Sequence, residues 1–133
     1  METKQVLVIR KDLKMRKGKI ASQAAHASMK VFFDRIGVLV RKPEGTSVIT
    51  ISDLHESEIE WIKGLFTKIT AYVNSEEELI AIHEKALEAG IPTSLITDAG
   101  KTEFKGVPTK TAAAIGPFHS EEIDKITGNL PLL

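Results

Sequence analysis

Short apolar runs alternate with amphipathic stretches along most of the chain. Residues 5–10 form a continuous apolar run of strand length, a pattern typical of a strand that helices cover on both faces. Beyond a basic loop, apolar positions from Ile20 to Val31 recur at helical spacing, so residues 19–35 are predicted to form an amphipathic helix. The chain therefore begins as a strand followed by a helix.

The same alternation continues to the other end of the sequence. Ser75 and Glu78 form a capping box, and Gly90 is placed to end the helix that they start. Ser120 can cap a last helix that Gly128 closes. Strands are predicted at 67–73, 93–97 and 111–116, and helices at about 53–66, 75–89 and 120–128.

Strands that alternate with helices in this way predict a three-layer α/β/α sandwich, formed by one domain that spans residues 1–133. Residues 36–51 depart from the alternation. They contain a Pro43-Glu44-Gly45 turn signal and a β-branched run, which together predict a hairpin or an extended loop. The order of the strands in the sheet does not follow from the sequence.

Composition narrows the possible classes of protein. With 42% apolar residues the chain can bury one core, but no apolar run approaches the roughly 20 residues that span a bilayer. The first residues do not resemble a signal peptide, so we expect a soluble, cytoplasmic protein without a membrane partner. The sequence has no cysteine, and its four histidines lack the spacing of metal ligands. We therefore expect no metal and no cofactor.

The charges are unevenly distributed although the formal net charge is zero. Residues 1–42 carry 11 Lys and Arg against 3 Asp and Glu, while residues 43–133 carry 7 against 15. Lys14, Arg16 and Lys17 lie in the basic loop before the first predicted helix, where they could bind phosphate groups. The alternative is that the two kinds of charge intermix once the chain folds.

One candidate site lies on the first predicted helix. Lys19, Gln23, His26 and Lys30 follow one another at helical spacing, so they form a single polar stripe. A lysine in the first turn does not favour the helix dipole, but together with the free amides of that turn it suits an anion. An ordinary solvated helix face would show the same pattern.

A second candidate site follows the third predicted strand of the main sheet. Asp98 falls where that strand ends, and ligands of α/β proteins tend to bind at such ends. Its carboxylate could orient or deprotonate a water molecule, and Thr102, Thr109 and Thr111 supply nearby hydroxyl groups. The competing interpretation is a simple Asp-x-Gly turn.

Several motifs together resemble those of a known family, the second type of peptidyl-tRNA hydrolase, found in archaea and eukaryotes. The resemblance extends over nearly the whole chain. It rests on the Lys/Gln/His helix start at 18–27, the Asp-Ala-Gly-Lys-Thr motif at 98–102, the segments 109–111 and 115–117, and the C-terminal helix at 123–128. Lys101, Glu103 and the segment 36–51, which looks like an insertion, depart from the family pattern.

The resemblance implies a mixed, mainly parallel four-stranded sheet between helices, a tRNA-linked substrate and no cofactor, in a family whose members are often homodimers. It assigns the reaction to four residues by position: Lys19, Asp98, Thr102 and Thr111. Substrate contacts are expected from Gln23, His26 and Thr109, and from Lys14, Arg16 and Lys17 of the basic loop.

The expected reaction is attack of water on the ester that joins a peptide to tRNA. Asp98 would position and partly deprotonate the water, while Lys19 and a threonine hydroxyl would stabilise the oxyanion. Lys19 could instead bind a phosphate group. Two other functions remain open, namely a non-catalytic module that binds RNA or protein, and a hydrolase of small acyl esters.

Overall fold

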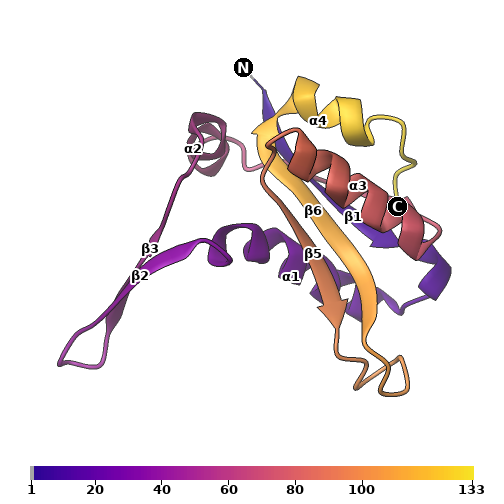
Figure 1. The fold of residues 1–133 in the computed structure, drawn as a ribbon, viewed down its shortest axis with the longest axis horizontal. Helices are drawn as coiled ribbons and strands as arrows, with labels where there is room; N and C mark the ends of the chain where they lie inside the picture. The colour runs from indigo at the N-terminus through magenta and orange to yellow at the C-terminus, as the bar shows by residue number, and fades with distance from the viewer. Residues whose placement is uncertain (1) are drawn as a thin grey trace.

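The computed structural model describes residues 2–133, and its strands and helices follow the predicted alternation (Figure 1). The strands are β1 (Thr3–Arg10), β2 (Ile36–Arg41), β3 (Ser47–Ile51), β4 (Lys68–Val73), β5 (Thr93–Asp98) and β6 (Thr109–His119). The helices are α1 (Lys17–Phe33), α2 (Glu56–Lys63), α3 (Glu76–Glu88) and α4 (Ser120–Thr127), and a 3₁₀ turn covers Lys11–Leu13.

The main sheet has four strands in the order β4-β1-β6-β5, and it is mixed as expected. The expectation that parallel pairing would dominate is wrong, because β1 pairs with β4 in parallel, whereas β6 pairs antiparallel with both β1 and β5. The reason lies in the connection between β5 and β6. Residues 99–108 contain no helix, and parallel neighbours need a crossover of a dozen residues or more.

Helices cover both faces of this sheet, which confirms the three-layer arrangement (Figure 1). Side chains of α3 and α4, such as Leu79 and Ile123, pack with Val6 and Val8 in the core on one face. On the other face α1 packs against Leu7 and Ile9 of the same strand together with residues of β5 and β6. Strand β1 is thus buried on both faces, as its continuous apolar sequence predicts.

Residues 36–51 form the hairpin that was one of the two predicted alternatives. Strands β2 and β3 pair with each other in a separate two-stranded sheet. Figure 1 shows this hairpin extending away from the three layers, beyond the end of α1 and the start of α2. No helix in the described part of the chain is long and apolar enough to cross a membrane.

Candidate active site

The carboxyl end of β5 places Asp98 at the edge of the sheet, and a tight turn holds its carboxylate. The backbone N–H of Gly100 donates a hydrogen bond of 2.8 Å to Asp98 Oδ2. Gly100 has a φ of +82°, and a Cβ added there would lie 2.3 Å from the carbonyl oxygen of Val107. Only glycine fits this turn, so the Asp-x-Gly sequence is both the predicted turn and the frame of the candidate site.

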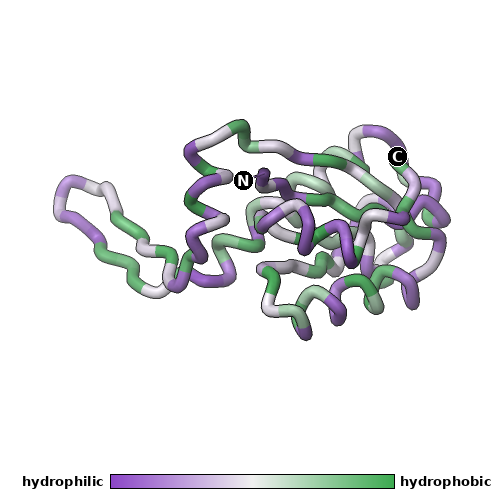
Figure 2. Tube along the Cα trace, turned by 90° about the horizontal axis from the view of Figure 1, so that it is seen from above, coloured by the Kyte–Doolittle hydropathy of each residue, from purple (hydrophilic) through white to green (hydrophobic). Residues whose placement is uncertain are grey.

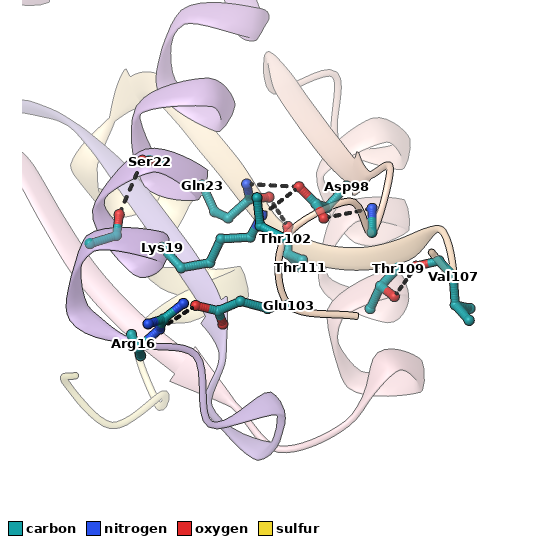
Figure 3. A network of polar contacts seen from close by, with 12 residues as sticks. Arg16, Lys19, Ser22, Gln23, Asp98, Thr102, Glu103, Val107, Thr109 and Thr111 are labelled. Atoms are coloured by element: carbon teal, nitrogen blue, oxygen red, sulfur yellow. Dashed lines mark hydrogen bonds and ion pairs between the residues drawn. The ribbon is translucent and has the colours of Figure 1, made fainter. Parts of the chain in front are cut away.

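The first turn of α1 brings Lys19 to the same point from the other side (Figure 3). Lys19 Nζ donates to Asp98 Oδ1 at 2.8 Å and to Thr102 Oγ1 at 2.9 Å. The side chains of Lys19 and Asp98 are only 13% and 14% exposed. The two candidate sites predicted from the sequence are therefore one site.

Two further predicted residues lie behind this ion pair. Gln23 is buried, and its Nε2 donates to Asp98 Oδ1 at 3.4 Å. The fully buried Thr111 donates its hydroxyl hydrogen to Gln23 Oε1. A chain of hydrogen bonds thus runs from β6 through α1 to the carboxylate on β5, which fixes the carboxylate from its buried side.

The contacts of Asp98 determine its protonation state. The hydrogen bond from Lys19 is the main cause that lowers the pKa of Asp98 below its ordinary value. Burial acts in the opposite direction and raises the pKa, while the Gly100 N–H, the charge of Lys19 and the Gln23 amide lower it further. The net shift is downward, so Asp98 is an ionised carboxylate at neutral pH.

An open groove of about 510 Å³ runs across this ion pair. Its lining comes from the start of α1 and from the loop after β5: Arg16, Gly18, Lys19, Ser22, Gln23, His26, Asp98, Thr102 and Glu103. Among these residues His26 is exposed. Arg16 Nε donates to Glu103 Oε1 at 3.0 Å, and the Arg16 side chain remains 83% exposed.

The remaining predicted residues lie at the margin of the site. Thr109 pairs with Asp98 across β5 and β6, but its hydroxyl donates to the Val107 carbonyl oxygen rather than to the network. Lys14 and Lys17 are exposed in the segment before and at the start of α1, outside the groove lining. The structure thus brings five of the predicted residues into one hydrogen-bonded network: Lys19, Gln23, Asp98, Thr102 and Thr111. Lys14, Arg16 and Lys17 of the basic loop lie outside that network.

Sequence reasoning did not identify two contributors to this site. The Gly100 amide holds Asp98, although the Asp-x-Gly motif does predict such a side-chain to backbone hydrogen bond. The Phe104 ring lies with its centroid 5.7 Å from Lys19 Nζ and packs into the core beneath α1. A lone phenylalanine in a polar loop gives no signal of this kind.

Comparison with known proteins gives the family to which this fold and groove belong. Residues 3–133 match the family model described as "Peptidyl-tRNA hydrolase PTH2". The chain belongs to the PTH2 family. The peptidyl-tRNA hydrolase of Methanothermobacter thermautotrophicus is 43% identical over 130 residues, which are 98% of this chain and 99% of that protein. The corresponding proteins of Methanocaldococcus jannaschii and Methanopyrus kandleri are 42% and 39% identical, over 98% of this chain and 99% and 97% of theirs.

The fold has also been seen in a protein of unknown function from Agrobacterium tumefaciens. That solved structure aligns with a TM-score of 0.55 and 16% sequence identity, over 100% of this chain and 98% of the other. At this identity the likeness concerns the fold alone. The PTH2 fold thus extends to sequences that differ from this one at most positions.

In this PTH2 chain the polar atoms of the groove retain capacity for a ligand. A carboxylate has about four acceptor positions and an ammonium group has three N–H donors. Lys19, Gln23 and Gly100 occupy three acceptor positions of Asp98, which leaves one on Oδ2. Asp98 and Thr102 occupy two donors of Lys19, so one N–H and the Thr102 O–H remain. The site can therefore accept one hydrogen bond from a ligand and donate two hydrogen bonds to it.

Among residues 2–133 there is no group of three or more histidine, aspartate or glutamate side chains placed to hold a metal ion.

Proposed function

We propose that this chain hydrolyses the ester bond between a peptide, or an N-acylated amino acid, and tRNA. The observation that carries the proposal is the contact of Lys19 with Asp98 and Thr102 in an open groove, in a chain of the PTH2 family. An ester hydrolase needs a group that orients water and donors for the oxyanion that forms. The unused acceptor position of Asp98 can orient the water, and the two unused donors, on Lys19 and Thr102, can bind the oxyanion.

Asp98 holds the attacking water through its unused Oδ2 position in this proposal. Because its pKa is lowered, Asp98 is a weak base, so it mainly orients the water before the reaction. It accepts the water proton as the new carbon–oxygen bond forms, and it returns that proton to the ribose oxygen as the ester bond breaks. The products are the free peptide and tRNA, and Asp98 ends as it began.

Lys19 and Thr102 stabilise the negative charge that develops on the ester carbonyl oxygen. These two groups lie side by side next to the carboxylate, since Lys19 Nζ contacts both Asp98 and Thr102. Hydrogen-bond donors that are already held in place stabilise the transition state most, because they need no rearrangement when the charge develops. Gln23 and Thr111 act as positioning residues. Gln23 lines the groove but is only 1% exposed, and its amide donates to the Asp98 carboxylate, while the fully buried Thr111 donates to Gln23.

An anion-binding role for Lys19 is the main alternative within the same function. Arg16, the residue before α1, makes no side-chain cap, so the first amides of the helix are free to bind a phosphate group beside Lys19. The exposed Lys14, Arg16 and Lys17 would extend such contacts along the tRNA backbone without sequence preference. A substrate released by the ribosome also implies a cytoplasmic location, which we include in the proposal.

Hydrolysis of N-acetylated aminoacyl-tRNA by the purified chain tests this function. We expect release of free tRNA that depends on enzyme concentration and continues in the presence of a strong chelator, because every group in the mechanism belongs to the chain. A small ester of the same N-acetylated amino acid should react far more slowly. Binding of tRNA without cleavage would instead support an RNA-binding module, and equal cleavage of both esters would support a general acyl hydrolase.

Acidification tests the protonation state proposed for Asp98. A group with a lowered pKa keeps its charge above that pKa and loses it only as the pH falls through the lowered value. The acidic limb of the single-turnover rate should therefore lie below the ordinary aspartate pKa of about 3.9. Circular dichroism at each pH would verify that the chain stays folded. An acidic limb centred between about pH 6 and 7 would contradict the proposal and indicate a base with a raised pKa.

Removal of the basic-loop charges tests the proposed path of the tRNA. In the triple variant Lys14→Ala, Arg16→Ala, Lys17→Ala, tRNA should bind more weakly and the slope of log K against log salt should flatten by about 2 to 3 units. The matched control is Lys63→Ala, Lys85→Ala, Lys125→Ala, which removes the same charge from α2, α3 and α4. Equal effects of the two triple variants would place the tRNA elsewhere.

A further inference from the structure

The ion pair between Arg16 and Glu103 places an acidic side chain in a groove that is expected to receive tRNA. Glu103 lies in the loop after β5, residues 99–108, in which the other two charged residues are Lys101 and Lys105. On the other side of the groove, the segment 14–19 has four basic residues and no acidic one. The Glu103 carboxylate therefore interrupts a surface that is otherwise basic along both segments.

The two members of this ion pair are exposed to very different degrees. The Glu103 side chain is 16% exposed, whereas the Arg16 side chain is 83% exposed. In the ion pair of Lys19 and Asp98, by contrast, both side chains are largely buried. Arg16 thus presents its guanidinium group to solvent, where a phosphate group can reach it, while the carboxylate that holds it lies deeper in the groove.

Only one hydrogen bond joins the pair (Figure 3). Arg16 Nε donates to Glu103 Oε1 at 3.0 Å, and among residues 2–133 the two terminal nitrogens of this guanidinium group have no acceptor. A guanidinium group has five N–H donors and often binds phosphate through two parallel hydrogen bonds. Exposed ion pairs contribute little stability. Arg16 can therefore exchange the carboxylate for a phosphate group.

The Glu103 carboxylate cannot move away in the same manner, because its loop is held on both sides. The preceding residue, Thr102, accepts a hydrogen bond from the start of α1, and the following residue, Phe104, packs into the core beneath that helix. Two backbone hydrogen bonds within residues 100–107 also close the loop. A phosphate group bound to Arg16 therefore has a fixed negative charge close to it.

We propose that Glu103 limits the affinity of the groove for tRNA by competing with phosphate groups for Arg16. Glu103 is a positioning residue in this role, because it acts through Arg16 and does not itself contact the tRNA. The inference rests on the proposed function, in which Arg16 belongs to the path of the tRNA. Its consequence is faster release of the product tRNA.

The chemistry of the proposed reaction gives a reason for such a limit. Hydrolysis changes only the ester, so substrate and product present the same phosphate groups to Arg16. Contacts that are equally strong before and after the reaction lower KM without raising kcat, and they also hold the product. Glu103 weakens these shared contacts. Less of the enzyme is then occupied by free tRNA, while the steps at the ester are unchanged.

Glu103→Gln separates the charge of this residue from its contact, because glutamine keeps an oxygen that can accept the Arg16 hydrogen bond. We expect deacylated tRNA to bind about two- to fivefold more tightly, since Arg16 then meets phosphate without a charged competitor. The slope of log K against log salt should steepen by up to about one unit. Titrations with tRNA at several salt concentrations measure both quantities. Glu122→Gln, which removes the charged partner of Lys125 on α4, is the matched control and should bind as the wild type does.

The same substitution in an Arg16→Ala background tests whether Glu103 acts through Arg16. There Glu103→Gln should change the affinity for tRNA by less than about twofold, since no guanidinium group remains to compete for. An equal gain in both backgrounds would show direct repulsion of the tRNA and overturn the proposal. Glu103→Ala should tighten binding as Glu103→Gln does. Weaker binding in Glu103→Ala, with no change in Glu103→Gln, would show that the contact only holds the loop, and would also overturn it.

Ester cleavage tests the effect on the product. In Glu103→Gln we expect a KM about two- to fivefold lower and inhibition by added tRNA stronger by the same factor, while the single-turnover rate at saturating enzyme stays within about twofold of wild type. A purely structural role would not give this combination. Thermal unfolding would verify that each variant is folded.

The two proposals can fail separately in these experiments. If the chain cleaves the ester but Glu103→Gln leaves the tRNA affinity and the product inhibition unchanged, only the role of Glu103 is overturned. If tRNA binds without cleavage, the proposed hydrolysis fails, and the binding series alone decides the role of Glu103. If no variant binds tRNA, both proposals are overturned.

Discussion

Asp98→Asn is expected to slow the chemical step by about 10² to 10⁴ while the affinity for tRNA changes little. Asparagine keeps the shape of the side chain, but its single carbonyl oxygen can accept the hydrogen bond of Lys19 or that of Gly100, not both, because the two now reach different carboxylate oxygens. It cannot accept the proton of the attacking water, and its neutral oxygen orients water less strongly than a carboxylate. The measurement is the single-turnover rate of ester cleavage at saturating enzyme, with the dissociation constant determined separately.

The control for Asp98→Asn must remove an ion pair without touching the groove. Asp124→Asn does so, because Asp124 pairs with Lys4 at 2.5 Å and its side chain is 54% exposed on α4. We expect wild-type rates from this control. If Asp98→Asn and Asp124→Asn cleave equally well, Asp98 has only a structural role and the proposed mechanism is wrong.

The meeting of Lys19 and Asp98 was predicted through the family resemblance, which assigns both residues to one reaction, and general rules of α/β folds agree with it. Asp98 ends a strand and Lys19 starts a helix, and such ends gather where ligands bind. The pattern of α1 was also informative, since Ala27 and Val31 are buried as predicted. Local periodicity determines these features, and it can be read without the tertiary structure.

The sequence could not predict how deep each polar residue of the site lies. Gln23 belongs to a stripe that looks solvated, and the sequence assigned it to substrate contacts, yet it is 1% exposed. Its burial depends on Asp98 of β5 and Thr111 of β6, which meet it only in the folded chain.

The same limit explains the wrong expectation of a mainly parallel sheet. The apolar run of β1 shows that both faces are covered, but not that β6 is the antiparallel neighbour on one side.

The β2–β3 hairpin shows a different limit. Its turn signal and β-branched residues predicted a hairpin as one of two alternatives, and the hairpin formed. Its apolar residues would ordinarily indicate burial in the core of the same chain. Their exposure is visible only in the structure, where the hairpin extends away from the rest of the chain (Figure 2).

Lys19→Ala separates the two roles that remain for the lysine. If Lys19 stabilises the oxyanion, the rate at saturating substrate should fall by about 10² or more. If Lys19 binds phosphate instead, the loss should appear in KM and be recovered by more tRNA. We expect the first result, because Lys19 Nζ already contacts both Asp98 and Thr102, the groups that flank the proposed position of the reacting ester. Lys125→Ala on α4, which removes an exposed partner of Glu122, is the matched control.

The double variant then tests whether Lys19 and Asp98 act as one unit. Lys19 holds the Asp98 carboxylate and lowers its pKa, so removal of either residue disturbs the function of the other. Effects of groups that act together are not additive. We therefore expect Lys19→Ala with Asp98→Asn to be little slower than the slower single variant. Rate losses that multiply, in variants whose thermal unfolding matches the wild type, would show that the two residues act at separate steps despite their 2.8 Å contact.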